Sequence, residues 1–432
     1  MEEKEIVVGG GPLEGSRSRS VMGRRIRSRS ADEWLGKFRK EYIDWWEFIP
    51  SRRARSADGR LEVQEKKENG KKETSDREPE EIEGKVVMSK AKAAEIEEEA
   101  FARFRRGWEH VNGGSHFEDL TLFSPMIFTH CTPGFKPIDA KLAKTVQICS
   151  IKIADVNHFK WPLQVYGVVA ARDCVDTHRN PIFLRPRDDC QIINDADPFL
   201  HLTGPVRAIV SEEPVDIEIQ LIVKGPTASE DRALISYPLL YDGDHADPSG
   251  MLIVEKNFCT LELSFQQLNR SVQATVFGVN IIGEKPASFG YGVRIVCSSL
   301  SQHGIEDRNE YTSKEVLLVD SKVGRPAIKH GYINLSRQVI SVELSGRLKL
   351  QIQAYTPSGN MVAKGHVIVV PKQCNTSDHE CNLGSFEIRF TIAWSLLIED
   401  EERILMNGRV DPFASCPLDP EFFRTGSISY LM

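Results

Sequence analysis

The sequence predicts a mainly β fold. The body is an antiparallel, sandwich-like arrangement of one or two β units, preceded by a helix and a disordered N-terminal arm. Three observations predict it. Apolar residues alternate with polar ones in many short segments between residues 144 and 397. No stretch of that region keeps a helical period over eleven residues. Residues 1–100 are far more polar and charged than the rest.

Alternation is clearest in residues 215–223, where Val215, Ile217 and Ile219 point one way. A strand with one apolar and one polar face is typical of antiparallel sheets. Nine segments are predicted as strands, at residues 145–154, 163–171, 215–223, 259–268, 272–282, 314–320, 337–344, 347–355 and 386–397. The predicted core contains Trp161, Val165, Ile217, Ile219, Leu221, Leu348, Leu350 and Trp394.

Residues 89–113 are predicted to form a helix. The segment is rich in Ala, Glu, Lys and Arg, Ser89 can cap its start, and two glycines follow it. Phe101, Phe104 and Trp108 fall at spacings of three and four residues, so they share one helical face. We expect this face to dock on the β body.

Residues 1–88 are predicted to be a largely disordered arm with a short amphipathic helix near 32–49. Residues 17–55 contain twelve Arg or Lys against five Asp or Glu, whereas residues 58–99 contain nine against fourteen. Residues 1–30 and 51–88 lack apolar periodicity and are expected to be disordered. The basic part can bind RNA or serve as a nuclear address, or it can be a solvated tail that the acidic part neutralises.

The body divides into a first β unit at 115–250 and a second at 251–398, followed by a C-terminal tail at 399–432. A faint repeat supports two units: residues 206–221 resemble residues 336–352, with Arg207 opposite Arg337 and Glu213 opposite Glu343. Residues 165–168 also resemble residues 276–279. Chance similarity between alternating strands is the alternative. If the repeat is real, both arginines should hold equivalent strand positions with a carboxylate or carbonyl partner.

The cysteine count and the distribution of apolar residues indicate the cellular location of the protein. The nine cysteines include no Cys-x-x-Cys pair and are odd in number, so a disulfide framework is not expected. The N-terminal segment lacks the pattern of a secretory signal, and no apolar run is long enough for a membrane span. We therefore expect a cytoplasmic or nuclear location. The net charge of −7 gives no overall reason to expect nucleic acid.

Several stretches resemble a plant family, mostly from grasses, that is known only as a domain of unknown function. The resembling stretches are residues 117–130, 161–191, 197–210, 223–234 and 333–344. The resemblance covers about two thirds of the chain and omits its first ~100 residues. Some relatives carry this domain behind a ribosome-inactivating N-glycosylase domain, which implies a link to plant stress or defence. It supplies no catalytic residues for this chain.

Glu99 and Arg103 superficially resemble the Glu–Arg helix of ribosome-inactivating enzymes. They are four residues apart instead of three, and the chain upstream has no room for the enzyme body. An exposed ion pair one turn apart on a helix is the simpler interpretation.

Two other patterns contain residues of the kinds that bind metal ions. Loops rich in aspartate can hold calcium, although interleaved arginines would pair with them; these residues are Asp173, Asp176, Asp188, Asp189, Asp195, Asp197, Asp242, Asp244 and Asp247. Cys374, His379 and Cys381 offer three zinc ligands without a fourth, so a hairpin loop with incidental thiols is expected.

The sequence thus favours a non-enzymatic binding or interaction module linked to stress or defence. The alternative is an enzyme acting on nucleic acid or carbohydrate with its site in loops between strands. No catalytic, cofactor-binding or metal-binding residue is assigned. The partner is unknown, with a protein partner expected ahead of RNA.

Overall fold

A computed structural model describes one compact part of the chain, which lies within Ala54–Met432. The predicted helix near 32–49, the predicted disorder of 1–30 and the tail at 399–432 lie outside the described residues. The described ranges are 79–113, 115–121, 140–243, 250–282, 290–300, 314–321, 328–329 and 332–398.

Helix α2 (Pro79–Val111) begins at Pro79, not at the predicted Ser89, so the predicted disorder of residues 51–88 is wrong for its last part. Proline suits the first position of a helix because its missing N–H has no partner there anyway. The aromatic residues lie near the C-terminal end of the helix.

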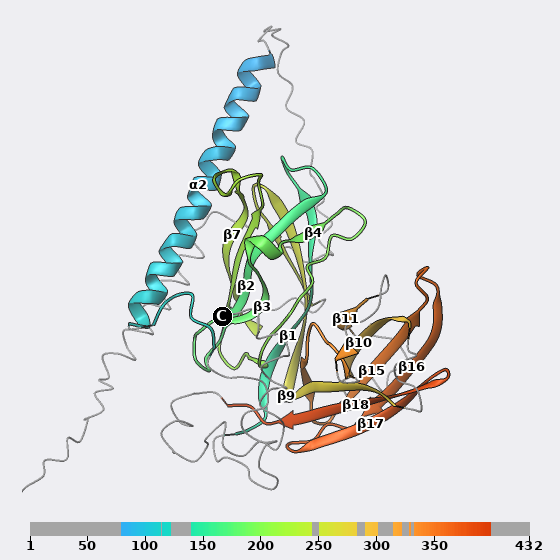
Figure 1. Cartoon of the computed structure of the whole chain (residues 1–432). Helices are drawn as coiled ribbons and strands as arrows, with labels where there is room; N and C mark the ends of the chain where they lie inside the picture. The colour runs from blue at the N-terminus through green and yellow to red at the C-terminus, as the bar shows by residue number, and fades with distance from the viewer. Residues whose placement is uncertain are drawn as a thin grey trace, which may run out of the picture. The chain divides into compact units, whose positions relative to one another are not determined.

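The rest of the described chain is built of antiparallel strands, which confirms the predicted fold class (Figure 1). Two short 3-10 turns, η1 (Arg187–Asp189) and η2 (Ala228–Glu230), are the other helical elements of the described body. The strands are β1 (Ala143–Val156), β2 (Leu163–Arg172), β3 (Asn180–Arg185), β4 (Gln191–Ile193), β5 (Ile209–Val210), β6 (Val215–Val223), β7 (Arg232–Tyr241), β8 (Met251–Glu255), β9 (Cys259–Ile282), β10 (Gly292–Leu300), β11 (Val316–Asp320), β12 (Ile328–Lys329), β13 (Tyr332–Ile333), β14 (Val339–Glu343), β15 (Arg347–Tyr355), β16 (Met361–Val369), β17 (Thr376–Leu383) and β18 (Phe386–Ser395).

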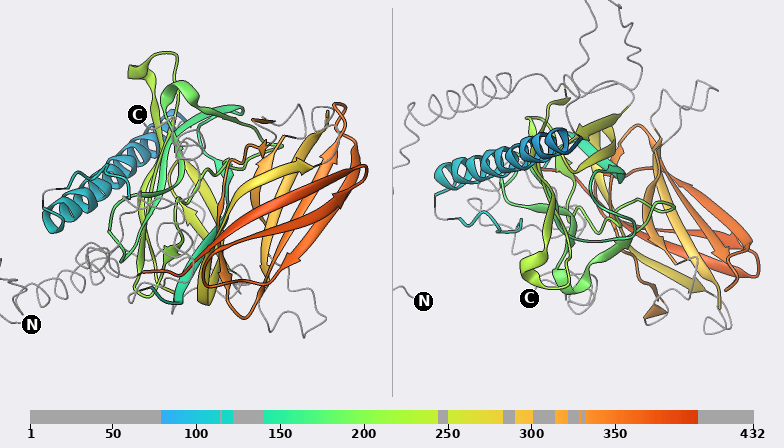
Figure 2. Two further views of the ribbon diagram at one scale, coloured as in Figure 1. Left: turned by 60° about the horizontal axis from the view of Figure 1, so that its bottom comes forward. Right: turned by 90° about the horizontal axis from the view of Figure 1, so that it is seen from above.

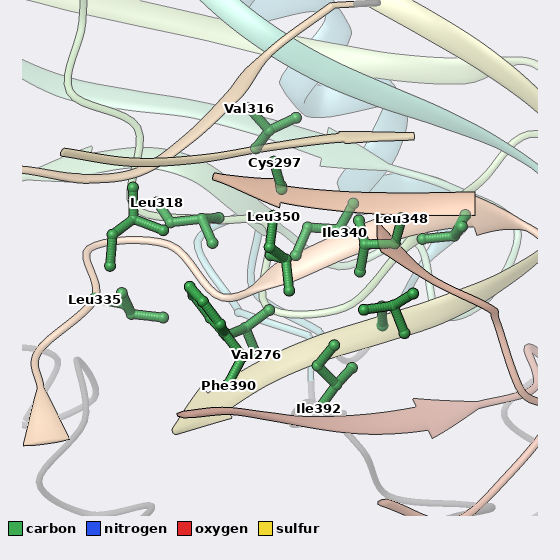
Figure 3. Close-up of a cluster of buried hydrophobic side chains, with 14 of the residues drawn as sticks. Val276, Cys297, Val316, Leu318, Leu335, Ile340, Leu348, Leu350, Phe390 and Ile392 are labelled. Atoms are coloured by element: carbon green, nitrogen blue, oxygen red, sulfur yellow. The ribbon is translucent and has the colours of Figure 1, made fainter. Parts of the chain in front are cut away.

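The strands form two halves with the same order. In the first half, the sheet β3-β2-β6-β7 packs on β5, β1, the start of β9, and β8. In the second half, the sheet β11-β10-β15-β16 packs on β14, the end of β9, β18 and β17. The eight strand segments of one half therefore have counterparts in the other, whereas β4, β12 and β13 have none, and all of the strand pairings are antiparallel. Figure 3 shows the apolar core of the second half.

Strand β9 belongs to both halves. Its first part pairs with β1 and β8, and its second part pairs with β14 and β18. The change falls near Arg270, whose φ of 47° interrupts the extended backbone. By strand pairing, the seam between the halves lies within β9 and not after residue 250.

The register supports one part of the proposed repeat. Ile209 pairs with Val146 in the first half, and Val339 pairs with Thr275 in the second. Each pair lies two residues after the arginine of its half. Residues 165–168 and 276–279 do not hold equivalent positions in the two halves, so this part of the proposed repeat is wrong. The first segment lies on β2 and the second on β9, and the counterpart of that part of β9 is β1.

Seven of the eight predicted core residues are buried, and Trp161 is only partly buried. The predicted strands at 259–268 and 272–282 are one strand. The strands that were not predicted are β3, β4, β5, β7, β8, β10, β12, β13, β16 and β17. The segment from Cys374 to Cys381 was expected to be a hairpin loop, but Thr376–Leu383 forms a strand because it pairs along its length with β18.

Candidate interaction surface

The outer side of β6 in the first half carries a buried carboxylate. Glu218 is 0% exposed and accepts hydrogen bonds from Arg172, at 2.8 Å, and from Arg179. Burial lowers the pKa of Arg172, and Glu218 opposes that shift. A buried charge is tolerated when it is paired and hydrogen-bonded in this way.

Helix α2 and the segment that follows it cover this ion pair. The guanidinium of Arg172 lies 4.1 Å from the ring centre of Phe117 and 4.6 Å from that of Trp108. Phe101 and Phe104 pack against Phe117, and α2 lies along the strands of the first half (Figure 2). The predicted docking of the aromatic helix face on the β body is confirmed.

A second buried network joins the loop after β2 to the segment before β5. Arg207 donates to both oxygens of Asp173, at 2.6 and 2.7 Å, and to Asp176 at 2.9 Å. Thr121 donates to the other oxygen of Asp176. His178 Nδ1 lies 3.9 Å from that same oxygen, beyond hydrogen-bond reach. The two aspartates hold the loops together, and both are engaged.

These contacts tell against the calcium interpretation. Asp173 and Asp176 are occupied by Arg207, and Asp189 pairs with Arg185 at 2.9 Å. Asp188, Asp195, Asp197 and Asp242 join no cluster of potential ligands, and Asp244 and Asp247 lie outside the described residues. Within the described ranges, no three His, Cys, Asp or Glu side chains are grouped so as to hold a metal ion.

The candidate zinc ligands and the Glu99–Arg103 pair lie in ordinary local surroundings. His379 Nε2 lies 2.9 Å from the hydroxyl of Ser377, and burial lowers the pKa of His379. Cys381 is buried on the same strand. Glu99 and Arg103 form an exposed pair at 3.5 Å, with 66% and 50% of their side chains accessible. That is the exposed ion pair that the sequence predicted.

Among the described residues, no helix packs on the matching outer side in the second half. We call it the β15–β16 face. Cross-strand partners point to the same side of a sheet, and Lys349 pairs with Ile368, Gln351 with His366, and Gln353 with Lys364. Their neighbours Leu350 and Ile352 point into the core, so the face points away from it. The face consists of Arg347, Lys349, Gln351, Gln353, Lys364, His366, Ile368 and Val370.

This face combines exposed aliphatic side chains with positive charge. Ile368 is 53% exposed and Val370 is 58% exposed. Among the described residues, no carboxylate forms an ion pair with Arg347, Lys349 or Lys364. No Asp or Glu occurs between Glu343 and Asp378 in the sequence. The face therefore has the composition of a surface that binds something apolar and acidic.

The fold and these faces define an antiparallel β protein whose two halves share a strand order, and among the described residues a helix covers the outer face of the first half alone. Residues 145–392 match the family described as "Domain of unknown function (DUF6598)", and the chain belongs to this family. No curated protein matches the chain. No helix among the described residues is long and apolar enough to cross a membrane.

Two solved structures show a distant likeness. Human GIVD cytosolic phospholipase A2 in complex with methyl gamma-linolenyl fluorophosphonate is 8% identical, with a TM-score of 0.19. A structure of the same enzyme with that inhibitor and terbium chloride is 9% identical, with a TM-score of 0.18. Each likeness covers 60% of this chain and 33% of the phospholipase chain. Scores this low carry no conclusion about fold or activity.

Proposed function

We propose that this protein is a non-enzymatic binding module that engages a protein partner through the β15–β16 face. The observation that carries the proposal is the contrast between two equivalent faces. The face of the first half is covered by α2, and Glu218 on it is fully buried. On the face of the second half, Ile368 and Val370 are more than half exposed and the basic side chains have no described carboxylate partner.

The paired state of the buried ionisable residues supports binding over catalysis. A general acid or base must reach its substrate with a free proton-transfer atom. Glu218, Asp173 and Asp176 are each held by an arginine beneath other side chains. An enzyme acting on nucleic acid or carbohydrate would need a carboxylate or histidine that is not consumed in this way.

The biological setting is part of the proposal and rests on sequence resemblance. The resembling stretches are those of a mostly grass family, some of whose members carry a ribosome-inactivating domain. On that ground we place the protein in plant stress or defence. The nine cysteines are odd in number and include no Cys-x-x-Cys pair, which supports the proposal of a cytoplasmic or nuclear location. Binding of RNA by the basic arm would be an additional activity.

Chemical crosslinking tests the proposal. The full chain is treated with a lysine-reactive crosslinker in an extract of the tissue that expresses it, and crosslinked peptides are identified by mass spectrometry. We expect crosslinks to other proteins to concentrate at Lys349 and Lys364 and to disappear in the Ile368→Asp variant. Lys160, an exposed lysine on the first half, is the matched control. Equal crosslinking at Lys160, unchanged by Ile368→Asp, would overturn the proposed function.

A further inference from the structure

We propose that the segment bound by the β15–β16 face is an acidic amphipathic α-helix of the partner, lying on this face as α2 lies on the equivalent face of the first half. The inference rests on the proposed function and adds the chemistry of the partner to it. Three features of the described residues support it: a register equivalence, a reversal of charge, and an exposed aliphatic pair.

The register equivalence follows from the shared strand order. Ile219 of β6 pairs with Val169 of β2 and Tyr237 of β7. Aligning the buried positions of β6 with those of β15, with the single insertion that the sequence repeat requires, places Leu350 opposite Ile219. Leu350 in turn pairs with Cys297 of β10 and Val367 of β16. The two sheets can therefore be compared position by position.

Charge is reversed between the two outer faces. The positions of Asp216 and Glu218 in β6 are taken by Arg347 and Lys349 in β15. In the first half, the chain supplies its own counter-charges, because Arg172 and Arg179 bind Glu218. In the second half, the described chain supplies none to Arg347, Lys349 or Lys364. The covering group must therefore bring the carboxylates.

The aliphatic positions match as well. Pro238 pairs with Glu218 on β7, and Leu240 pairs with Asp216. The counterpart of Pro238 on β16 is Ile368, which pairs with Lys349, and Val370 directly follows the end of β16. Pro238 is buried and Leu240 is partly buried, whereas Ile368 and Val370 are exposed. Burying such side chains removes apolar surface from water and so stabilises a complex. The covering group must therefore also be apolar on one side.

A helix fits this face better than RNA or a lipid surface. Aliphatic side chains at the edge strand give bases nothing flat to stack on, and stacking is a main source of single-strand affinity. A membrane would satisfy the charges, but the equivalent face of this fold is already covered by an α-helix with an apolar stripe. From Arg347 to Gln353, β15 spans ~20 Å. About four helical turns cover that length.

The probe is an 18-residue peptide labelled with fluorescein. Leu occupies positions i, i+3, i+4 and i+7 in each pair of helical turns, and Glu occupies the other positions. A second peptide has Gln in place of every Glu. We expect the full chain to bind the Glu peptide in fluorescence anisotropy and to bind the Gln peptide at least ~10-fold more weakly. Added salt should weaken the first interaction because it screens exposed charges.

Variants assign the binding to the face. Lys349→Glu combined with Lys364→Glu should raise the Kd for the Glu peptide at least ~10-fold, and Ile368→Ser should raise it without changing the charge. Lys160→Glu combined with Lys224→Glu is the matched double reversal in the first half and should leave the Kd unchanged. Circular dichroism must show wild-type folding for each variant.

Two results would overturn the inference. One is absence of binding to the Glu peptide, or binding that the double reversal leaves intact. The other is preference for phosphatidylserine vesicles over the Glu peptide, abolished by the same double reversal. In the second case the face would bind a lipid surface. Because the crosslinking experiment uses no peptide, it judges the proposed function separately from the helical nature of the partner.

Discussion

Arg207 and Arg337 hold the same position in the two halves, two residues before β5 and β14 respectively, and both are buried. Their partners differ. Arg207 binds the carboxylates of Asp173 and Asp176, which outweigh the effect of burial and raise its pKa. Arg337 donates to the carbonyl of Ile148, its Nε has no partner among the described residues, and burial lowers its pKa to about 10.

This difference in partners predicts that the same substitution changes the free energy of unfolding by different amounts at the two positions. Arg207→Met leaves two buried carboxylates without a counter-charge, so we expect a loss of ~3–5 kcal/mol in the free energy of unfolding. Arg337→Met strands no carboxylate and removes a costly buried charge, so we expect a change within ~1 kcal/mol. Urea unfolding followed by tryptophan fluorescence measures both. Equal losses in the free energy of unfolding would show that the two arginines contribute equally to stability, which would contradict this prediction.

Ile219 tests the strand register on which the comparison of the halves depends. It is 0% exposed in the centre of β6. Ile219→Ala should lower the free energy of unfolding by ~2–5 kcal/mol and Ile219→Val by ~0.5–1.5 kcal/mol, in proportion to the methyl groups removed. Ile192, 66% exposed, is the control; Ile192→Ala should change stability by less than ~0.5 kcal/mol. A smaller effect at Ile219 than at Ile192 would contradict the register.

Trp108 anchors α2 to the first half. Its ring contacts Arg172, and its Nε1 donates to the carbonyl of Thr177 at 3.0 Å. Trp108→Ala should cost ~3–5 kcal/mol and speed hydrogen exchange in α2 and around Glu218, because it opens the cover of a buried ion pair. Ile96→Ala, on an exposed position of the same helix, should change neither. Unchanged exchange at Glu218 in the Trp108 variant would argue against the cover.

The buried cysteines should resist alkylation. Burial raises the pKa of Cys149 to about 11 and that of Cys259 to about 12, and it also raises the pKa of Cys297. At pH 8 these thiols stay protonated, and only the thiolate reacts. Iodoacetamide should therefore label Cys190 and Cys374 in the folded protein, and Cys149, Cys259 and Cys297 only after unfolding. Peptide mapping by mass spectrometry reads the result; rapid labelling of Cys297 in the folded protein would contradict it.

We predict no N-glycosylase activity toward ribosomal RNA. Glu99 and Arg103 form an exposed pair on α2 and frame no pocket for an adenine sugar. Incubation of ribosomes with the protein should release no adenine above the level seen with Glu99→Gln. Release by the wild type that this variant lacks would refute the prediction.

Sequence periodicity predicted β6 and β15 with the bounds that the structure has, because their apolar residues alternate without interruption. β7 was missed because Pro238 argues against a central strand, and the structure accommodates it at the edge of a sheet. β16 was missed because Ile368 adds an apolar residue to its outer side, which hides the alternation. The candidate face could not be predicted without β16.

The sequence by itself determined that the body is antiparallel β and that the helix before it has an aromatic face, and it offered a relation between Arg207 and Arg337 with chance similarity as the alternative. Each of these conclusions depends on residues a few positions apart or on a direct comparison of two segments. Only the tertiary structure decided that Arg207 has aspartate partners and Arg337 has carbonyl partners, and that one outer face is covered while the other is open. Those outcomes depend on contacts between residues far apart in the chain, such as Arg337 with Ile148, and local periodicity carries no information about such contacts.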